Sequence, residues 1–77
     1  MVSALRLQVL NNRVYRVLFT NGLHVGNLKL ISGIWKFKAI GYDAEGQVIP
    51  GGGPLTDKHN VVVVKADEAN LNQLLVS

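Results

Sequence analysis

The chain has 77 residues, of which 48% are hydrophobic, and it carries a net charge of +3 and no cysteine. A chain of this length forms a single domain, expected over residues 1–77, and buries only about 60–65% of its unfolded surface. The composition excludes a disulfide framework, and the longest aliphatic run, Val61–Val64, is far shorter than the roughly 20 apolar residues of a membrane span. We therefore expect a small cytoplasmic domain without a membrane segment.

The charges are divided between the two halves of the chain. Residues 1–42 contain six Lys and Arg and no acidic residue, a charge of +6, whereas residues 43–77 contain five acidic residues and two lysines, a charge of −3. A surface of one sign attracts polyanions, but two oppositely charged halves also neutralise each other when they fold together. The sequence leaves both outcomes open.

The first half follows the period of two that is typical of β-strands. Apolar and polar residues alternate over 5–9, 13–19 and 23–31, which predicts three strands. Asn21–Gly22 lies between the second and third, and this dipeptide favours a type I′ hairpin turn, in which both central residues have positive φ.

A fourth strand is predicted over 34–42, with Lys36 and Lys38 on one face and the other face formed by Trp35, Phe37, Ala39 and Gly41. Residues 43–46 (DAEG) suit a type I turn with glycine in the left-handed position, and residues 47–49 return as a short strand.

The remaining elements are a glycine-rich connection, one more strand and a helix. Pro50–Pro54 leaves the sheet because two prolines and three glycines cannot sustain a ladder, and Val61–Val64 is predicted to be a buried strand. Asp67 is a suitable cap for a terminal helix. One stripe of this helix carries Leu71, Leu74 and Leu75.

Together these elements predict a β-rich α+β fold, an antiparallel meander of five to six strands with one C-terminal helix. Two architectures fit strands of this number and length. One is a curled sheet with the helix covering one face, and the other is a small barrel whose pattern resembles SH3-like or OB-like barrels.

The register of the first hairpin decides which residues share a face. If Asn11–Asn12 is a two-residue turn, the apolar residues of 5–9 form the core with Val14, and the opposite face mixes cations with Tyr15 and Phe19. A loop longer by one residue places the apolar residues of 5–9 beside Tyr15 and Phe19 instead. Asn-Asn is a weaker turn signal than Asn-Gly, so both registers stay open.

The first register suits a single-stranded nucleic acid. Aromatic rings stack on bases for about 1–3 kcal/mol each, while Lys and Arg neutralise phosphates. The candidate residues of this basic and aromatic face are Arg6, Arg13, Tyr15, Arg16, Lys36 and Lys38.

The glycine-rich segment is the second candidate site. Three consecutive glycines lose much backbone entropy on ordering, and their unshielded N–H groups are suited to an anion nest. Its candidate residues are Gly51, Gly52, Gly53, Thr56, Lys58 and His59. The alternative is that the glycines permit left-handed turns or close packing against a neighbouring strand. The spacing matches neither a P-loop nor a dinucleotide-binding motif.

The side chains suited to catalysis or metal binding are few. Thr56, Asp57 and His59 form one local cluster, whereas catalysis needs a nucleophile, a base and an orienting group that converge in a pocket. His24 and His59 supply fewer ligands than a zinc site requires. We expect a protein that is not an enzyme and has neither a metal nor a cofactor.

The run Val61–Val64 is apolar on both faces of a strand. One face packs in the core, and the other is covered either by the C-terminal helix, the simpler arrangement, or by a second copy in a homodimer. The leading interpretation is a small interaction module that binds a protein partner or itself. The alternative is a single-stranded nucleic-acid-binding domain.

Overall fold

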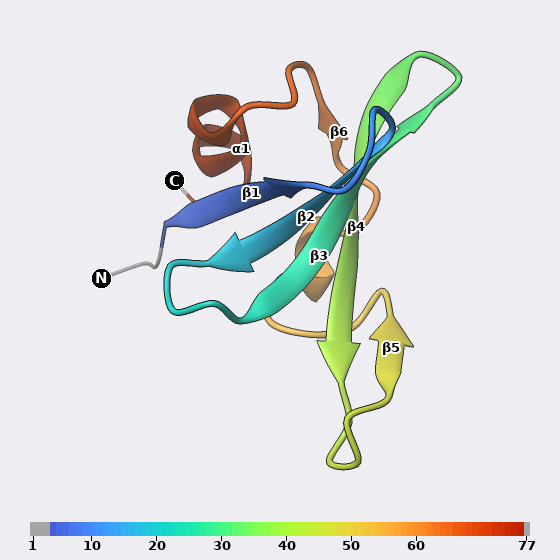
Figure 1. Cartoon of the computed structure of the whole chain (residues 1–77), viewed down its shortest axis with the longest axis vertical. Coiled ribbons are helices and arrows are strands. Elements are labelled where there is room, and N and C mark those ends of the chain that lie inside the picture. The colour runs from blue at the N-terminus through green and yellow to red at the C-terminus, as the bar shows by residue number, and fades with distance from the viewer. Residues whose placement is uncertain (1–3, 77) are drawn as a thin grey trace.

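The structure, a computed structural model, describes residues 4–76; residues 1–3 and 77 lie outside the described part. Within it, strands and two helices follow one another along the chain (Figure 1). The strands are β1 (Leu5–Val9), β2 (Val14–Phe19), β3 (His24–Ile31), β4 (Ile34–Tyr42), β5 (Val48–Pro50) and β6 (Val62–Val63). The helices are the 3-10 helix η1 (Thr56–Lys58) and the α-helix α1 (Glu68–Leu75).

The strands form one open antiparallel sheet. They lie in the order β1-β2-β3-β4-β5, and β6 also pairs with β4. β5 pairs with residues 40–42 at the end of β4, whereas β6 pairs with Trp35 and Lys36 near its start, so both lie along the same edge of β4. The predicted meander with one C-terminal helix is confirmed, and the sheet is not closed into a barrel.

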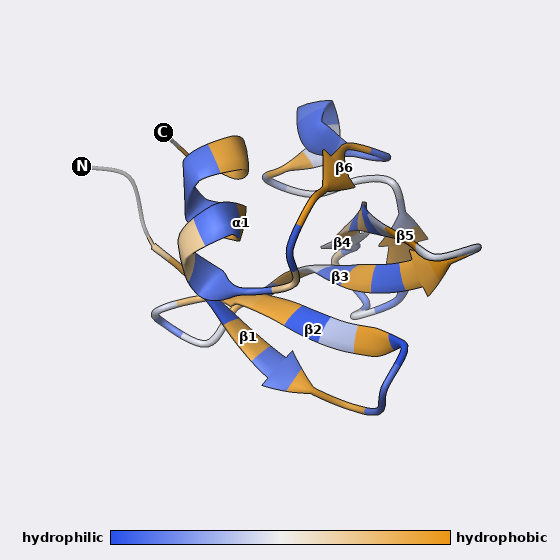
Figure 2. Cartoon of the chain, turned by 90° about the horizontal axis from the view of Figure 1, so that it is seen from above, coloured by the Kyte–Doolittle hydropathy of each residue, from blue (hydrophilic) through white to orange (hydrophobic). Residues whose placement is uncertain are grey.

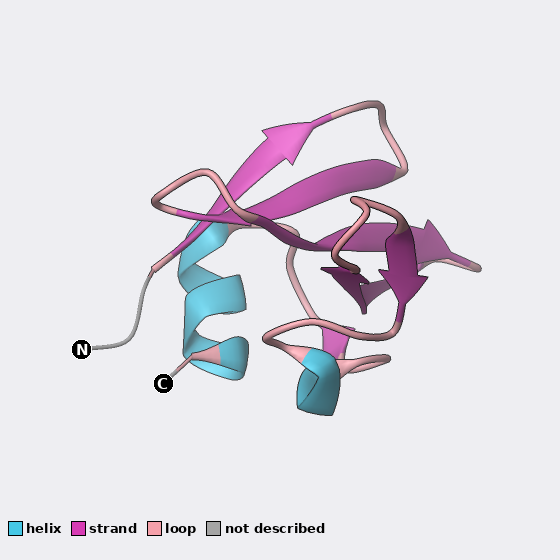
Figure 3. Cartoon of the chain, turned by 90° about the horizontal axis from the view of Figure 1, so that it is seen from below, coloured by secondary structure: helices cyan, strands magenta, loops and turns pink. Residues whose placement is uncertain are grey.

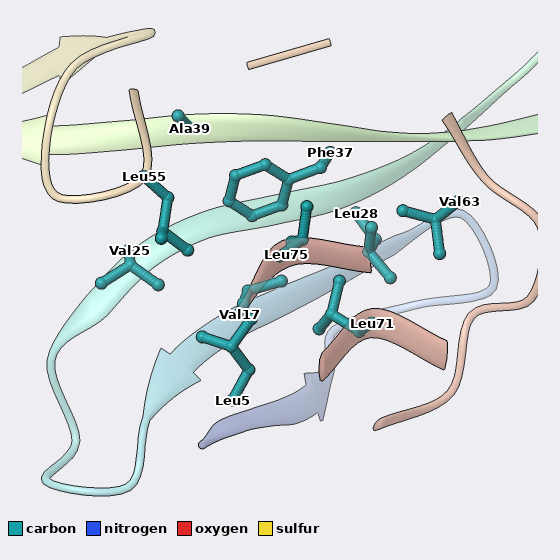
Figure 4. Packing of buried hydrophobic residues seen from close by; sticks show 10 residues of the cluster. All are labelled: Leu5, Val17, Val25, Leu28, Phe37, Ala39, Leu55, Val63, Leu71 and Leu75. Atoms are coloured by element: carbon teal, nitrogen blue, oxygen red, sulfur yellow. The ribbon is translucent and has the colours of Figure 1, made fainter. Parts of the chain in front are cut away.

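The core lies between one face of the sheet and the two helices. Figures 2 and 3 show α1 and η1 on the same side of the sheet, while neither covers the opposite face. Side chains from β1 to β4, from β6, from α1 and from the segment before η1 meet there (Figure 4). The buried residues are Leu5, Val17, Val25, Leu28, Phe37, Ala39, Leu55, Val63, Leu71 and Leu75.

The C-terminal helix begins at the predicted cap. The Asp67 side chain accepts a hydrogen bond of 2.7 Å from the N–H of Asn70. Leu71 and Leu75 are four residues apart and both are buried, as expected for one helix face. Leu74 is 38% exposed, so two of the three predicted leucines face the core.

Side chains of α1 also occupy the free edge of β1. Asn72 accepts from the Leu5 N–H at 2.6 Å and donates to the Leu5 carbonyl at 3.0 Å, as a neighbouring strand would. Glu68 accepts from the Leu7 N–H at 3.0 Å. Because unpaired edge groups are templates for aggregation, α1 protects β1 as well as covering the core.

The first hairpin adopts the longer of the two registers that the sequence left open. Leu5 pairs with Phe19, and this register makes residues 11–13 the loop. The apolar residues of β1 therefore share the helix-covered face with Tyr15 and Phe19. The Tyr15 ring packs against the core, with its centroid 4.9 Å from that of Trp35.

The Asn21–Gly22 turn differs from the predicted type I′ geometry. Gly22 has a φ of 91°, whereas the backbone of Asn21 is not in the positive-φ region. The Gly22 N–H donates to the Phe19 carbonyl at 2.9 Å. Two successive residues of positive φ occur instead between β3 and β4, at Ser32 (51°) and Gly33 (78°).

Candidate nucleic-acid interface

The uncovered face of the sheet carries most of the cations of the first half. Cross-strand partners lie on the same face, so the registers define rows of side chains across the sheet. One row consists of Gln8, Arg16, Asn27 and Lys38. The next row consists of Val14, Lys29, Lys36 and Val62. Arg6, two residues before Gln8 on β1, is on the same face. The "basic face" comprises Arg6, Arg16, Lys29, Lys36 and Lys38.

The acidic residues of the second half leave this face positive. Within residues 4–76 there is one ion pair, from Arg6 Nε to Glu68 Oε1 at 3.5 Å, and both side chains are exposed, so it contributes little. Lys29 and Lys36 are direct cross-strand partners. Like charges in that position destabilise a sheet by about 0.2–1 kcal/mol. Among residues 4–76, four of the five cations of the basic face therefore have no ion-pair partner.

The predicted basic and aromatic residues are only partly brought together. Four of them, Arg6, Arg16, Lys36 and Lys38, lie on the basic face. Arg13 is in the exposed loop of the first hairpin, where its N–H donates to Asn11 Oδ1 at 2.8 Å. Tyr15 lies on the other, helix-covered face because of the hairpin register.

Sequence reasoning missed Lys29 and the aromatic residue of this face, Tyr42. Tyr42 is in phase with Lys36 and Lys38 along β4, and it is 43% exposed. This period of two was the signal that could have identified it. Lys29 is on the face because it pairs with Lys36, a contact that requires the β3–β4 register.

A polar network orients these side chains beside the cations. His24 Nδ1 lies 2.8 Å from the Tyr42 hydroxyl and 3.4 Å from Arg16 Nη2, and its Nε2 lies 3.0 Å from Asn27 Oδ1. Arginine only donates and the amide oxygen only accepts, so Nδ1 is the acceptor and Nε2 carries the hydrogen. The network holds the Tyr42 ring at one end of the basic face.

The glycine-rich loop packs on the backbone of β4. The Gly51 N–H donates to the Ala39 carbonyl at 2.8 Å, and the Gly52 N–H to the Ile49 carbonyl at 3.1 Å. Gly51 and Gly53 have φ values of 78° and 85°, and a Cβ on Gly53 would overlap the β4 backbone. The glycines thus provide left-handed turns and a close approach to the backbone of β4, which is what the structural alternative to an anion nest predicts. Anion binding by their N–H groups stays a prediction.

Of the other predicted loop residues, His59 bonds to β4 and Thr56 bonds within the loop. His59 Nδ1 accepts from the Ala39 N–H at 3.0 Å, so its Nε2 carries the ring hydrogen. The Thr56 hydroxyl donates to the Gly51 carbonyl at 2.6 Å, and Lys58 is the last residue of η1.

A pocket of about 310 Å³ lies where the basic face meets this loop. It joins Lys38, from one predicted site, to Gly51 and His59 from the other. We call it the β5 pocket, and the residues that matter for its chemistry are Lys29, Lys38, Val48, Pro50, Gly51 and His59. A smaller pocket of about 220 Å³ includes Leu23 and Tyr42 in its lining.

The β6 strand buries one face and exposes the other. Val63 is buried, whereas Val62 and Val64 are 50% and 78% exposed. The expectation that the C-terminal helix covers this second face is wrong, because α1 packs on the same side of the sheet as Val63. Ile31 and Ile34, direct partners in the β3–β4 hairpin, are also exposed. We call Val62, Val64, Ile31 and Ile34 the "apolar strip"; Val62 pairs with Lys36, and Val64 directly follows β6.

Comparison with protein-family models, with curated proteins and with solved structures finds no match. Across residues 4–76, His, Asp and Glu side chains form no cluster of three that could hold a metal ion. That same part of the chain contains no helix of the length and hydropathy needed to cross a membrane.

Proposed function

We propose that this chain is a non-enzymatic binding module that holds single-stranded nucleic acid on its basic face. The observation that supports the proposal is the set of five cations on an uncovered sheet face, with Arg6 alone in an ion pair among residues 4–76. The direct opposition of Lys29 and Lys36 weakens the sheet unless a counter-charge is present. A row of phosphates supplies that counter-charge.

The form of the face favours an unpaired strand over a duplex. Neighbouring strands lie about 4.8 Å apart and same-face residues along a strand about 6.8 Å apart, so the cations form a shallow grid. Neither helix projects from this face to enter a groove of a duplex (Figure 3). The exposed Tyr42 ring offers a surface for base stacking.

Fluorescence anisotropy with labelled oligonucleotides tests the proposal. Five phosphate contacts give a slope of log K against log salt of about −3.5 for a single strand, so affinity falls roughly 100-fold between about 50 and about 200 mM salt. Arg16→Ala or Lys29→Ala lowers the slope by about 0.7 each. Lys65→Ala removes an exposed cation outside the face and is the matched control. Absence of binding at low salt refutes the proposal.

A second proposal concerns the apolar strip, through which the chain associates with a second copy. The Phe37 N–H donates to the Val61 carbonyl, and Trp35 pairs with Val63. In an antiparallel ladder the backbone groups of Val62 then point away from β4, towards the free edge. Antiparallel pairing of β6 with its symmetry mate uses this edge in an isologous contact and covers the exposed valines.

The mass in solution, measured by analytical ultracentrifugation from micromolar to millimolar concentration, tests this second proposal. We expect a dimer at the upper concentrations, and Val64→Lys shifts it to a monomer. Leu74→Lys changes an exposed leucine on α1 and is the control, since it leaves the strip intact. A monomer over the whole range removes this proposal and leaves the nucleic-acid proposal standing.

A further inference from the structure

We infer that the β5 pocket is a binding site for one nucleotide. Its phosphate is bound by Lys29, Lys38 and His59, and its base packs against Val48 and Pro50. This inference rests on the proposed function, because it assigns one defined position on the basic face. It adds a site that binds a single nucleotide, in contrast to a charged surface that attracts any polyanion.

The cationic side of the pocket is held in place by the fold. Lys38 Nζ donates to Asn60 Oδ1, which ties the lysine to the loop that follows η1. Lys29 lies diagonally across the β3–β4 ladder from Lys38, because their direct partners are Lys36 and Asn27 respectively. Two ammonium groups on one wall of a pocket, with no carboxylate within ion-pair distance among residues 4–76, favour a phosphate there.

His59 contributes a donor of fixed direction. Its Nδ1 accepts from the Ala39 N–H, so its hydrogen is on Nε2. Within residues 4–76, Nε2 has no hydrogen-bond partner, and it lies beside Gly51, whose added Cβ would be 3.5 Å away. His59 and Gly51 both line the pocket, so this N–H is a donor at its wall.

The remaining wall is apolar and suits a flat ring. Val48 and Pro50 of β5 pair with Tyr42 and Ile40, so they lie on the basic face with their side chains directed to the same side as the cations. Val48 and Pro50 are exposed. The volume of about 310 Å³ is at the lower end of that of small-molecule sites, which fits one nucleotide and not a larger ligand.

Titration with adenosine 5′-monophosphate, followed by NMR of the backbone amides, tests the inference. We expect shifts of the Ala39 and Gly51 signals, binding about tenfold weaker with inorganic phosphate, and none with adenosine at the same concentration. Lys38→Gln weakens nucleotide binding about tenfold or more, since it removes a charged contact. Lys65→Gln removes the same charge at an exposed lysine outside the basic face and leaves nucleotide affinity within about twofold.

Val48→Ser separates the two halves of the site, because it weakens the nucleotide and leaves inorganic phosphate unchanged. Equal losses for Lys65→Gln and Lys38→Gln, or unmoved Ala39 and Gly51 signals, overturn the inference. If those signals stay unmoved while oligonucleotides still bind, the pocket inference fails and the proposed function stands. If the mononucleotide binds as described and oligonucleotides do not, the proposed function fails and the pocket remains.

Discussion

Replacing Lys36 with glutamate is expected to stabilise the fold and to impair binding at the same time. Lys36 lies directly opposite Lys29, and this like-charge pair costs about 0.2–1 kcal/mol. The substitution removes the repulsion and adds an attraction of similar size, so the free energy of unfolding rises by about 0.4–2 kcal/mol. For a domain of this length each kcal/mol corresponds to about 4–8 °C in Tm, which gives a rise of roughly 2–16 °C.

The same change removes one positive charge from the basic face and adds a negative one. The salt slope of oligonucleotide binding therefore becomes shallower by about 1.4, twice the effect of one lost contact. Thermal unfolding followed by circular dichroism measures the first effect, and anisotropy titration measures the second. At about 1 M salt the gain in Tm disappears, because the Debye length falls to about 3 Å.

Lys65→Glu reverses one charge away from the sheet face and is the control for binding. A lower Tm for Lys36→Glu would show that the lysine pair is not a source of strain. An unchanged oligonucleotide affinity would show that the basic face does not contact the strand.

Three further predictions concern stability and are measured by urea denaturation. Asn72→Ala removes two hydrogen bonds to the Leu5 backbone and lowers the free energy of unfolding by about 2–3 kcal/mol. Asn72→Asp keeps the acceptor for the Leu5 N–H but turns a carboxylate oxygen towards the Leu5 carbonyl, so it is destabilising as well. An unchanged free energy of unfolding in both variants contradicts this role. Gly53→Ala costs at least about 2 kcal/mol, because the residue has positive φ and the added Cβ overlaps the backbone of β4. Gly46→Ala has a similar φ but lies in open space, so it costs about 1 kcal/mol. A smaller loss at Gly53 than at Gly46 refutes the close packing. Asp67→Ala removes the helix cap and costs about 1 kcal/mol, and an unchanged midpoint shows that the cap is not needed.

The strands and the helix were predictable because their signals are local. Alternation of side chains, the Asp43–Gly46 turn and the Asp67 cap each depend on a few neighbouring residues, and each element lies close to its predicted bounds. The division of β4 into an apolar and a lysine face followed from the same alternation. Lys36 and Lys38 were therefore placed together on one face correctly.

The register of the first hairpin was not predictable from the same signals. Asn11 Oδ1 accepts from the Arg13 N–H, a local side-chain turn that lengthens the loop by one residue. Asn-Asn permits this turn as readily as a two-residue one. A shift of one residue moves Tyr15 to the core side, so the exposed tyrosine on the basic face is Tyr42.

Contacts between distant segments account for the rest. The β5 pocket requires the glycine-rich loop to return along β4, which no local pattern specifies. Val61–Val64 is apolar on both faces, so the sequence contains no preference for the face that α1 covers. Lys29 was missed because its neighbours on the face come from β2 and β4.

The blocking of β1 by α1 has a consequence for assembly. At Leu5 and Leu7 that border of the sheet is already occupied, whereas the border along β4 ends in the free side of β6. Two molecules joined through β6 would each present the β1 border, occupied at Leu5 and Leu7, and the outer edge of β5, which has three residues and ends in Pro50. Both borders are poor templates for strand addition, so the exposed valines need not lead to a fibril.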